Sequence, residues 1–487
     1  MVEILNAKEE QLPQTSLAGK LPRNVAIVAA VLISLLAAVL LLQGFDLLGQ
    51  PVRVGRGVRI GAASPIGNRL LVVAPHPDDE SLAAGGLIQQ ALAEGRKVEV
   101  VVITGGDGNR GAARVCSGKD APTPADFTAM GAERMRETRL ATSHLGLPAR
   151  DLLFLGYADG SLNSLWGSNW DYNKLHLGLN GARHAPYDFA YQKRAPYCGA
   201  NLVKNLESVM KGFGPNSILY PDAEDDHHDH WAANAFIQYA LTQAGYRAHE
   251  YTYLVHRNDF PVPRQYAPAA SMTPPPALEL SGEQWELAPL SQHEEQVKGE
   301  ALKEYRVPAR VSGPFIESFI RKDELTRQVP PGQVWSIGPT KPDLAARTMP
   351  YVVNSDPPSD LMRPDASGST EITRVAFAQG KAVSYIGMET EGAISNDVTY
   401  TCRLRIFRGS GVSRADIAVH GKATTWLKFA RNSIYHSGAI PVRRLATRLW
   451  IEVPSSTLAG ANTVMMSVDS IEGGHMEDRT AWQRYQL

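Results

Sequence analysis

Two short motifs in the chain combine imidazole and carboxylate side chains, the mixture that suits a divalent metal such as zinc. The first motif is Ala74–Glu80, with the sequence APHPDDE, and the second is His227–His230, with the sequence HHDH. Zinc in a hydrolytic enzyme takes three ligands from the protein and keeps one position open for water. The two motifs together therefore indicate a metal centre with hydrolytic chemistry.

The residue types within the motifs predict distinct roles. His76 and Asp79 stand three positions apart on a tight turn, so both can converge on one ion, and His230 can supply the third ligand. Asp78 is then left beside the metal as a general base that takes a proton from water. We expect these four residues to form the centre of a zinc site.

The second motif contains two further polar residues with a predicted role. His227 can stand across the site and either stabilise an oxyanion or protonate a leaving amine. Asp229 is suited to orient an imidazole from outside the ligand shell. A simpler interpretation is that Asp78–Glu80 and His227–His230 only cap the helices that follow them, since carboxylates are favoured in a first helical turn. The occurrence of both motifs together favours the metal site.

An apolar run precedes each motif and predicts the strand that positions it. Leu70–Ala74 leads into the first motif, and Ser217–Pro221 leads into the second. In an open α/β sheet, functional sites lie just beyond the carboxyl ends of the strands. We therefore expect both motifs at the same edge of one sheet.

Apolar runs and helical patterns alternate across residues 67–330. The expected strands are 70–74, 97–104, 151–155, 217–221 and 250–256, and the expected helices are 81–95, 126–145, 198–212, 229–244 and 291–305. Strands that alternate with helices form right-handed βαβ units. The pattern predicts an α/β catalytic domain with a Rossmann-like, mostly parallel sheet.

The sequence changes character after residue 330. Residues 331–369 are rich in Pro, Asp and Ser, which is typical of a linker. From 370 to 487, apolar stretches alternate with turn-rich gaps, which predicts an all-β, sandwich-like domain. This domain could be a glycan-binding module or a packing partner of the catalytic domain, and Trp426 and Trp450 could be binding platforms or core residues.

The N-terminal part contains one candidate membrane segment, Val25–Leu42, which is apolar apart from Ser34. Its length meets the threshold for a membrane-spanning helix, and no clear cleavage site follows, which favours an uncleaved anchor over a signal peptide. Lys20 and Arg23 abut the run and favour a cytoplasmic N-terminus. We expect a single-pass membrane protein with an extracytoplasmic catalytic domain. The expected segments are a tail over 1–24, a transmembrane anchor over 25–43 and a linker over 44–66.

The bulk composition narrows the class of protein. With 487 residues the chain is too long for one ordinary core, which predicts two soluble domains. It contains 49 Lys and Arg residues and 50 Asp and Glu residues. The chain therefore lacks the excess of basic residues that would indicate nucleic-acid binding. Cys116 and Cys198 fall in loop-like stretches and could form a disulfide or stay free thiols. No pattern indicates an oligomeric state.

The stretch Ala74–Glu80 resembles the A-H-P-D-D-E signature of the LmbE/PIG-L family of zinc-dependent N-deacetylases, and His227–His230 resembles its second signature, H-x-D-H. The resemblance extends over residues 67–320. Further matches are Thr104–Gly108, Arg134 with Glu137, Leu145–Gly146, Leu155–Gly160, and Lys298, Ala301 and Tyr305 in the last helix. The departures are Pro75 before the histidine, Asp225 and Asp226 beside the second motif, and Arg306–Val307 after Tyr305.

The resemblance implies specific roles in the site. His76, Asp79 and His230 would be the zinc ligands, Asp78 the general base, His227 the electrophilic or acid histidine, Asp229 its orienting partner, and Arg134 and Asp159 the residues that hold a sugar. On the residues alone, Arg134 could instead pair with Glu137 on a helix, and Asp159 could be a turn residue before Gly160.

The segment between Asp159 and Cys198 is rich in aromatic side chains, which suit stacking on sugar rings and equally suit the packing of a long surface loop. These aromatic residues are Trp166, Trp170, Tyr172, Tyr187 and Tyr191.

The residues and the resemblance together predict a zinc-dependent N-deacetylase. Its expected reaction is hydrolysis of an N-acetyl group from an N-acetylated amino sugar, in a GlcNAc-type glycan or glycolipid, with release of acetate. Its expected partners are that substrate, a zinc ion and the membrane through the N-terminal helix. Two alternatives stay open: a zinc amidohydrolase that acts on a non-sugar N-acyl substrate, and a membrane-anchored glycan-binding protein.

Overall fold

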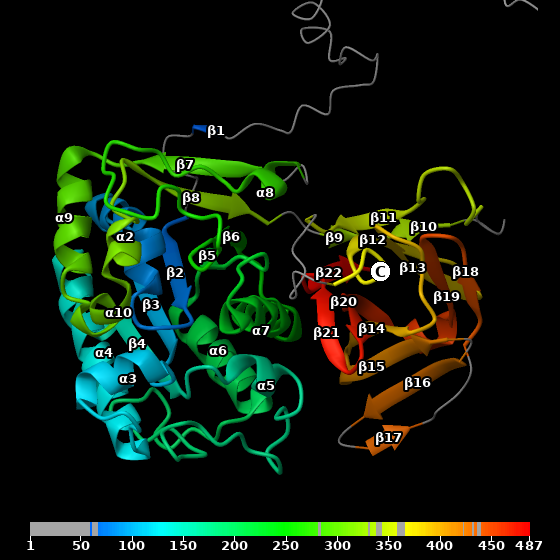
Figure 1. Ribbon diagram of the computed structural model, residues 1–487, viewed down its shortest axis with the longest axis horizontal. Coiled ribbons are helices and arrows are strands. Elements are labelled where there is room, and N and C mark those ends of the chain that lie inside the picture. The colour runs from blue at the N-terminus through cyan, green and yellow to red at the C-terminus, as the bar shows by residue number, and fades with distance from the viewer. Residues whose placement is uncertain are drawn as a thin grey trace, which may run out of the picture. The chain divides into compact units, whose positions relative to one another are not determined.

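A sheet of eight strands forms the centre of the N-terminal part of the computed structural model (Figure 1). The strand order is β1-β7-β8-β6-β5-β2-β3-β4. The strands are β1 (Arg59–Ile60), β2 (Arg69–Ala74), β3 (Lys97–Thr104), β4 (Leu152–Tyr157), β5 (Ser217–Pro221), β6 (His249–Tyr253), β7 (Trp285–Pro289) and β8 (Asp323–Gln328). The structure describes residues 59–60, 67–280, 284–329, 332–337, 343–357, 366–421, 423–430, 433–435 and 440–487.

The central strands of this sheet are parallel, as the sequence predicts. Strand β2 pairs in parallel with β3 on one side and with β5 on the other, so Val72 lies between Val100 and Leu219. Every side chain from Leu70 to Ala74 is at most 1% exposed, because helices cover both faces of the sheet. The pair β7 and β8, which the sequence analysis did not predict, extends the sheet in antiparallel fashion beyond β6.

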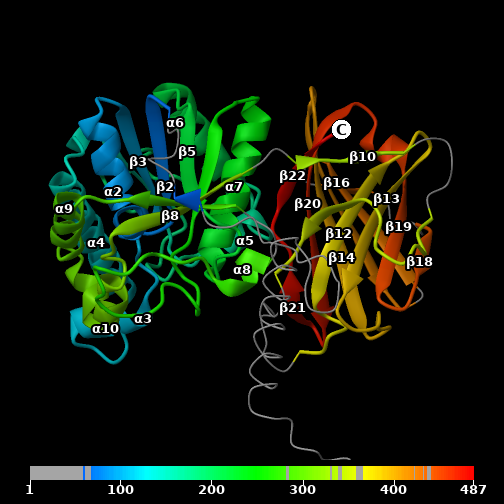
Figure 2. The same ribbon diagram turned by 90° about the horizontal axis from the view of Figure 1, so that it is seen from above.

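Helices pack on both faces of the sheet. Figures 1 and 2 show α2, α4 and α9 on one face, and α6 and α7 on the other. The helices are α2 (Asp79–Ala93), α3 (Arg110–Ser117), α4 (Pro124–His144), α5 (Leu162–Trp166), α6 (Gly199–Phe213), α7 (His228–Ala244), α8 (Pro276–Leu280), α9 (Gln292–Leu302) and α10 (Arg306–Glu317), with a 3-10 turn at Ala149–Asp151. The five predicted helices are present, whereas α3, α5, α8 and α10 were not predicted.

The C-terminal part is built of two further sheets. One has the order β10-β12-β13-β19-β18, with β11 on β12, and the other has the order β17-β16-β15-β14-β20-β22-β9, with β21 on β20. The strands are β9 (Gly332–Gln333), β10 (Trp335–Ser336), β11 (Val352–Ser355), β12 (Ile372–Gln379), β13 (Val383–Thr390), β14 (Val398–Arg408), β15 (Gly411–His420), β16 (Ala423–Ala430), β17 (Ser433–Tyr435), β18 (Val442–Arg444), β19 (Arg448–Pro454), β20 (Ala461–Glu472), β21 (His475–Arg479) and β22 (Gln483–Gln486), with a 3-10 turn at Ser455–Leu458.

Side chains from both sheets form one common core, for example Phe377 of β12 and Leu404 of β14. Three short strands, β9 to β11, lie within residues 331–369, the predicted linker, and pair with strands of these sheets. Trp450 is completely buried, so of its two predicted roles it has that of a core residue. The side chain of Trp426 lies outside the part of the chain that the structure describes.

The β-rich part packs against the helices α5 and α7. Trp482 stands 5.2 Å from Trp166, measured between ring centroids, and its carbonyl oxygen accepts a hydrogen bond of 2.8 Å from Gln238. Trp166 and its neighbour Trp170 also contact Phe236 of α7. These two tryptophans therefore pack the long segment after β4 onto the domain core, which is one of the two alternatives that the sequence left open.

Residues 1–58 lie outside the described residues, and with them the predicted tail, the anchor over 25–43 and most of the linker over 44–66. By their internal contacts, all described residues belong to one compact unit. Within the described ranges, no helix has both the length and the apolar character to cross a membrane. The three cysteines are all described and free, with Cys116 exposed and Cys198 buried.

Candidate active site

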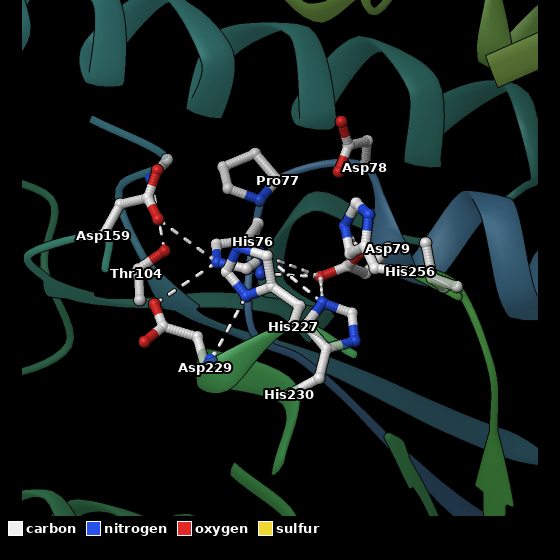
Figure 3. A network of polar contacts seen from close by, with 12 residues as sticks. His76, Pro77, Asp78, Asp79, Thr104, Asp159, His227, Asp229, His230 and His256 are labelled. Carbon is white, nitrogen blue, oxygen red and sulfur yellow. Dashed lines mark hydrogen bonds and ion pairs between the residues drawn. The ribbon is translucent and has the colours of Figure 1, made fainter. Parts of the chain in front are cut away.

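Both motifs lie at the point where the chain changes direction across the sheet. From β2 the chain proceeds to β3 and β4 on one side, whereas from β5 it proceeds to β6 on the other side. Such a switch point leaves a crevice at the carboxyl ends of two neighbouring strands. His76 follows β2 and His230 follows β5, and Figure 3 shows the side chains of the two motifs pointing toward one another.

The turn after β2 has an uncommon backbone conformation. Asp78 has a φ of 122°, which non-glycine residues rarely adopt, and such strain clusters at functional sites. The turn places Asp79 so that its Oδ2 accepts a hydrogen bond of 2.9 Å from the backbone N–H of His76. The Asp78 side chain makes no capping hydrogen bond to α2, although Asp78 stands at the N-cap position. The capping interpretation therefore does not account for this residue.

Three donor atoms from the two motifs form a small triangle. Asp79 Oδ2 lies 3.2 Å from His76 Nδ1 and 3.0 Å from His230 Nε2. The two nitrogens of His76 and His230 are 3.3 Å apart. Ligands bound tetrahedrally to zinc at 2.0–2.2 Å would be separated by about 3.3–3.6 Å, so the triangle, with edges of 3.0–3.3 Å, is close in size to one face of a zinc tetrahedron.

A buried polar atom without a partner supports the same conclusion. Asp79 Oδ1 is buried and has no hydrogen-bond partner among the described residues. An unpaired carboxylate oxygen is costly in a protein interior, and a metal ion would satisfy it. The donor set of two imidazoles and one carboxylate is also the set that catalytic zinc uses. The residues present therefore fit a zinc ion.

Each of the two histidines has a carboxylate on the nitrogen that points away from the triangle. Asp225 Oδ2 lies 3.1 Å from His230 Nδ1, and Asp229 Oδ2 lies 3.3 Å from His76 Nε2. Such partners fix the tautomer and the orientation of a metal-binding imidazole. The sequence analysis assigned no role to Asp225. It expected Asp229 to orient His227, whereas the Asp229 carboxylate contacts His76.

Asp229 is itself held by backbone groups. Its two carboxylate oxygens accept hydrogen bonds of 2.8 Å from the N–H of Gly160 and 2.9 Å from the N–H of Leu162. The backbone N–H of Asp229 donates to Nδ1 of His227, so His227 does cap α7 through its side chain. Burial and the neighbouring histidines His76 and His230 lower the pKa of His227 to about 4, so its imidazole is neutral at physiological pH.

Arg134 pairs with Asp78 and leaves Glu137 to another partner. Arg134 Nη2 donates to Asp78 Oδ2 at 3.0 Å and to the carbonyl oxygen of Pro77 at 2.7 Å, and Nη1 donates to the carbonyl oxygen of Gly106 at 2.9 Å. Glu137 instead accepts a hydrogen bond of 3.0 Å from the backbone N–H of Val307. The guanidinium therefore holds the turn that carries Asp78, and the intrahelical pair is absent.

Asp159 lies inside the site and does not act only as a turn residue. Its Oδ1 is 3.2 Å from His76 Nε2, and its Oδ2 accepts a hydrogen bond of 2.9 Å from the N–H of Gly108. The N–H of Asp159 donates to Asp107, whose other oxygen accepts from the hydroxyl of Tyr187 at 2.8 Å. Tyr187 is only 5% exposed, so this aromatic residue supports the site through its hydrogen bond to Asp107, and its ring is not accessible for stacking on a sugar.

A cavity of about 270 Å³ opens beside the triangle. Its polar side includes His76, Asp78, Asp159 and His227. Its other side is apolar and comes largely from α10, with Val307, Val311, Phe315 and Ile316. Both His256, which follows β6, and this helix were missed by the sequence analysis. A lone histidine as the last residue of the predicted strand 250–256 was the signal that could have found His256.

Residues in and after the late helix α9 make buried polar contacts with the start of α2 and with β8, close to the site. Lys298 Nζ lies 2.7 Å from Glu324 Oε1, and both side chains are almost completely buried. The Tyr305 hydroxyl contacts the Glu80 carboxylate and lies 2.9 Å from Ser81 Oγ, at the start of α2. These contacts give a structural role to two of the residues that carried the family resemblance in the late helix.

The sequence model of the family described as PIG-L, GlcNAc-PI de-N-acetylase, matches residues 71–241, which contain both motifs. No protein of curated function matches the chain in sequence. Among solved structures, the A40926 pseudoaglycone deacetylase Dbv21 is 18% identical, with 54% of this chain and 96% of that chain covered and a TM-score of 0.36.

Two further solved structures have similar values. The N,N'-diacetylchitobiose deacetylase from Pyrococcus horikoshii is 15% identical, with 54% of this chain and 84% of that chain covered and a TM-score of 0.32. GalB, the 4-carboxy-2-hydroxymuconate hydratase from Pseudomonas putida KT2440, is 16% identical, with 56% and 99% covered and a TM-score of 0.32. Similarities at this level do not indicate a substrate for this chain.

Proposed function

Because the chain contains a domain of the PIG-L family over residues 71–241, a family of hydrolytic deacetylases, we propose that this protein hydrolyses the N-acetyl group of an amino sugar and releases acetate. The proposed substrate is a GlcNAc-type unit in a glycan or glycolipid. The observation that carries the proposal is the triangle of His76, Asp79 and His230 at the edge of a cavity that Asp78 also lines.

The metal chemistry of the proposal is that of zinc. His76, Asp79 and His230 would hold the ion, which when bound polarises an acyl carbonyl and lowers the pKa of water. Asp225 and Asp229 would keep the two imidazoles in the orientation that binding requires.

Asp78 is the proposed general base. It stands next to the triangle without being part of it, and it lines the cavity where the amide would lie. Arg134 holds its carboxylate through a hydrogen bond of 3.0 Å, so the base is positioned before a substrate arrives. Its function is to take a proton from the attacking water and to return a proton to the leaving amine.

His227 is the proposed donor to the oxyanion. Its Nδ1 accepts a hydrogen bond of 3.2 Å from the backbone N–H of Asp229. A neutral imidazole with an accepting Nδ1 carries its proton on Nε2, and this N–H can donate to a charge that develops on the acyl oxygen. This assignment favours the electrophilic role for His227 over that of an acid. The neutral ring carries one proton, which it shares in a hydrogen bond and does not transfer.

One observation favours a second candidate substrate, a non-sugar N-acyl amide. Arg134, the residue expected to hold a sugar, directs its two terminal guanidinium nitrogens to Asp78, Pro77 and Gly106. The opposite wall of the cavity is apolar and carries Val311 and Phe315. A substrate with an apolar group beside its amide would suit that wall.

Acetate release by the full-length chain would test the proposal. The panel would contain N-acetylglucosamine, N-acetylated oligosaccharides, a GlcNAc glycolipid and N-acetylated apolar amino acids, each with zinc or with chelator. We expect zinc-dependent release from the sugars, and its loss in Asp78→Asn. Release only from the amino acids would select the second candidate, and no release from any compound by a zinc-loaded, folded chain would overturn both.

A further inference from the structure

His256 lies at the same edge of the sheet as the two motifs. It follows β6, which pairs in parallel with β5, the strand that leads to His230. The backbone N–H groups of Val255 and His256 both donate to Asp225 Oδ2, each at 2.9 Å. The same oxygen lies 3.1 Å from His230 Nδ1, so one carboxylate positions both the His230 ring and the backbone of His256.

The imidazole of His256 reaches the triangle from its open side. His256 Nε2 lies 3.7 Å from Asp79 Oδ1, the buried oxygen that has no hydrogen-bond partner. The ring centroids of His256 and His230 are 4.8 Å apart. One donor atom from each of the four residues His76, Asp79, His230 and His256 lies within 4.8 Å of the others, and Figure 3 shows the rings gathered around Asp79.

The outer face of the His256 ring is supported by packing. The ring of Phe315 on α10 stacks on it, with centroids 5.6 Å apart and an interplanar angle of 19°. The guanidinium group of Arg264 lies over the ring of Phe315 in a cation–π contact, with its carbon 4.9 Å from the ring centroid. The imidazole is therefore held between the triangle and an aromatic wall, with one ring nitrogen within 4.8 Å of a donor atom from each of the other three residues.

We propose that His256 is a fourth protein ligand of the zinc site, a proposal that rests on the metal centre of the proposed function. Three ligands leave a tetrahedral zinc ion one open position, and a fourth from the protein fills it. In the resting protein the ion would thus be bound by three imidazoles and one carboxylate. The attacking water or the substrate would then have to displace His256 or add as a fifth ligand, so this residue would control both metal affinity and access.

Metal binding by the full-length chain tests this without any substrate. Zinc affinity would be measured by competition with a chelator, and Co²⁺ in place of zinc would report the ligand set through its visible absorption. We expect His256→Gln to weaken zinc binding by at least about tenfold, because a lost ligand costs no less than a lost outer partner. The Co²⁺ spectrum should also change. The matched control is His249→Gln, an exposed histidine at the start of the same strand, β6, and outside both candidate donor groups.

A second variant keeps the test decisive if His256→Gln folds poorly. His256→Cys offers a thiolate, and a thiolate bound to Co²⁺ adds a ligand-to-metal charge-transfer band that no other residue of the site produces. That band would support the proposal. Wild-type affinity and an unchanged Co²⁺ spectrum in His256→Gln, or a bound Co²⁺ ion without the band in His256→Cys, would overturn it. Failure of the wild-type chain to bind either metal would instead overturn the zinc site itself.

Discussion

Arg134 and Asp78 form an ion pair in the wall of the cavity, with Nη2 and Oδ2 3.0 Å apart and the two side chains 8% and 9% exposed. The same guanidinium binds the carbonyl oxygens of Pro77 and Gly106. It thus spans the turn whose positive φ places Asp78. We therefore expect Arg134 to act mainly as a positioning residue for the proposed base Asp78.

Replacing Arg134 should lower kcat and leave KM nearly unchanged. Arg134→Met keeps the length of the side chain but leaves Asp78 and two carbonyl oxygens without their donor, so we also expect a loss of about 3–5 kcal/mol in the free energy of unfolding. Steady-state kinetics and urea unfolding would measure both effects. A raised KM with an unchanged kcat would instead show that Arg134 binds the substrate directly.

Replacing the proposed base should abolish activity without releasing the metal. General base catalysis contributes about 10²- to 10⁴-fold, so Asp78→Asn should lower kcat by at least about 100-fold. Zinc content, measured by elemental analysis, should stay at the wild-type value because Asp78 is not in the triangle. Asp120→Asn, at an exposed position, serves as the control. Loss of zinc together with activity would contradict the assigned role.

Replacing Asp225 should weaken metal binding although Asp225 is outside the triangle. Asp225→Asn places an amide where the carboxylate now faces His230 Nδ1 and three backbone N–H groups, those of His227, Val255 and His256. Loss of such an outer partner costs about 10- to 100-fold in metal affinity. Chelator competition would measure the change. An unchanged zinc affinity would mean that the imidazole of His230 is oriented by its packing alone.

A side chain from the β-rich part should influence the site through α7. The guanidinium carbon of Arg479 on β21 lies 3.7 Å from the ring centroid of Trp231, and Nη2 lies 3.0 Å from His228 Nδ1. We expect Arg479→Ala to lose about 0.5–2 kcal/mol of stability, the value of a cation–π contact, and to lower kcat because the second motif is less firmly held. Arg479→Lys should recover part of the activity. Arg443→Ala, exposed on β18, is the control, and equal kinetics in Arg479→Ala and the control would refute the coupling.

The apolar run Val25–Leu42 should anchor the full-length chain in a membrane. Expressed with its N-terminus, the chain should sediment with membranes and resist extraction by alkaline carbonate, whereas detergent should release it. A variant with two lysines inserted in the middle of the run should be extracted by carbonate, because charge at the centre of a bilayer costs several kcal/mol. Extraction of the unaltered chain by carbonate would refute the anchor.

Local patterns in the sequence were sufficient for the parallel strands β2 to β6 and for the residues of the triangle. A strand such as β2 is a continuous apolar run, and burial on both faces of a parallel sheet requires that pattern. His76 and Asp79 share one turn, so their convergence follows from their spacing alone. The antiparallel strands β7 and β8 and the helix α10 have no comparably clear pattern, which is why they were missed.

The amino-acid sequence by itself therefore indicated the candidate metal ligands, the candidate base and the sheet that brings the two motifs together. The tertiary structure decided which side chain serves which partner. It paired Asp225 with His230, Asp229 with His76 and Arg134 with Asp78, and it brought His256 to the same point. Some of these pairs join residues that are far apart in the chain. In the others, several neighbouring residues of the same chemistry could have been the partner. Such contacts depend on the order of the strands and the path of the loops, which cannot be predicted from the spacing of residues within one motif.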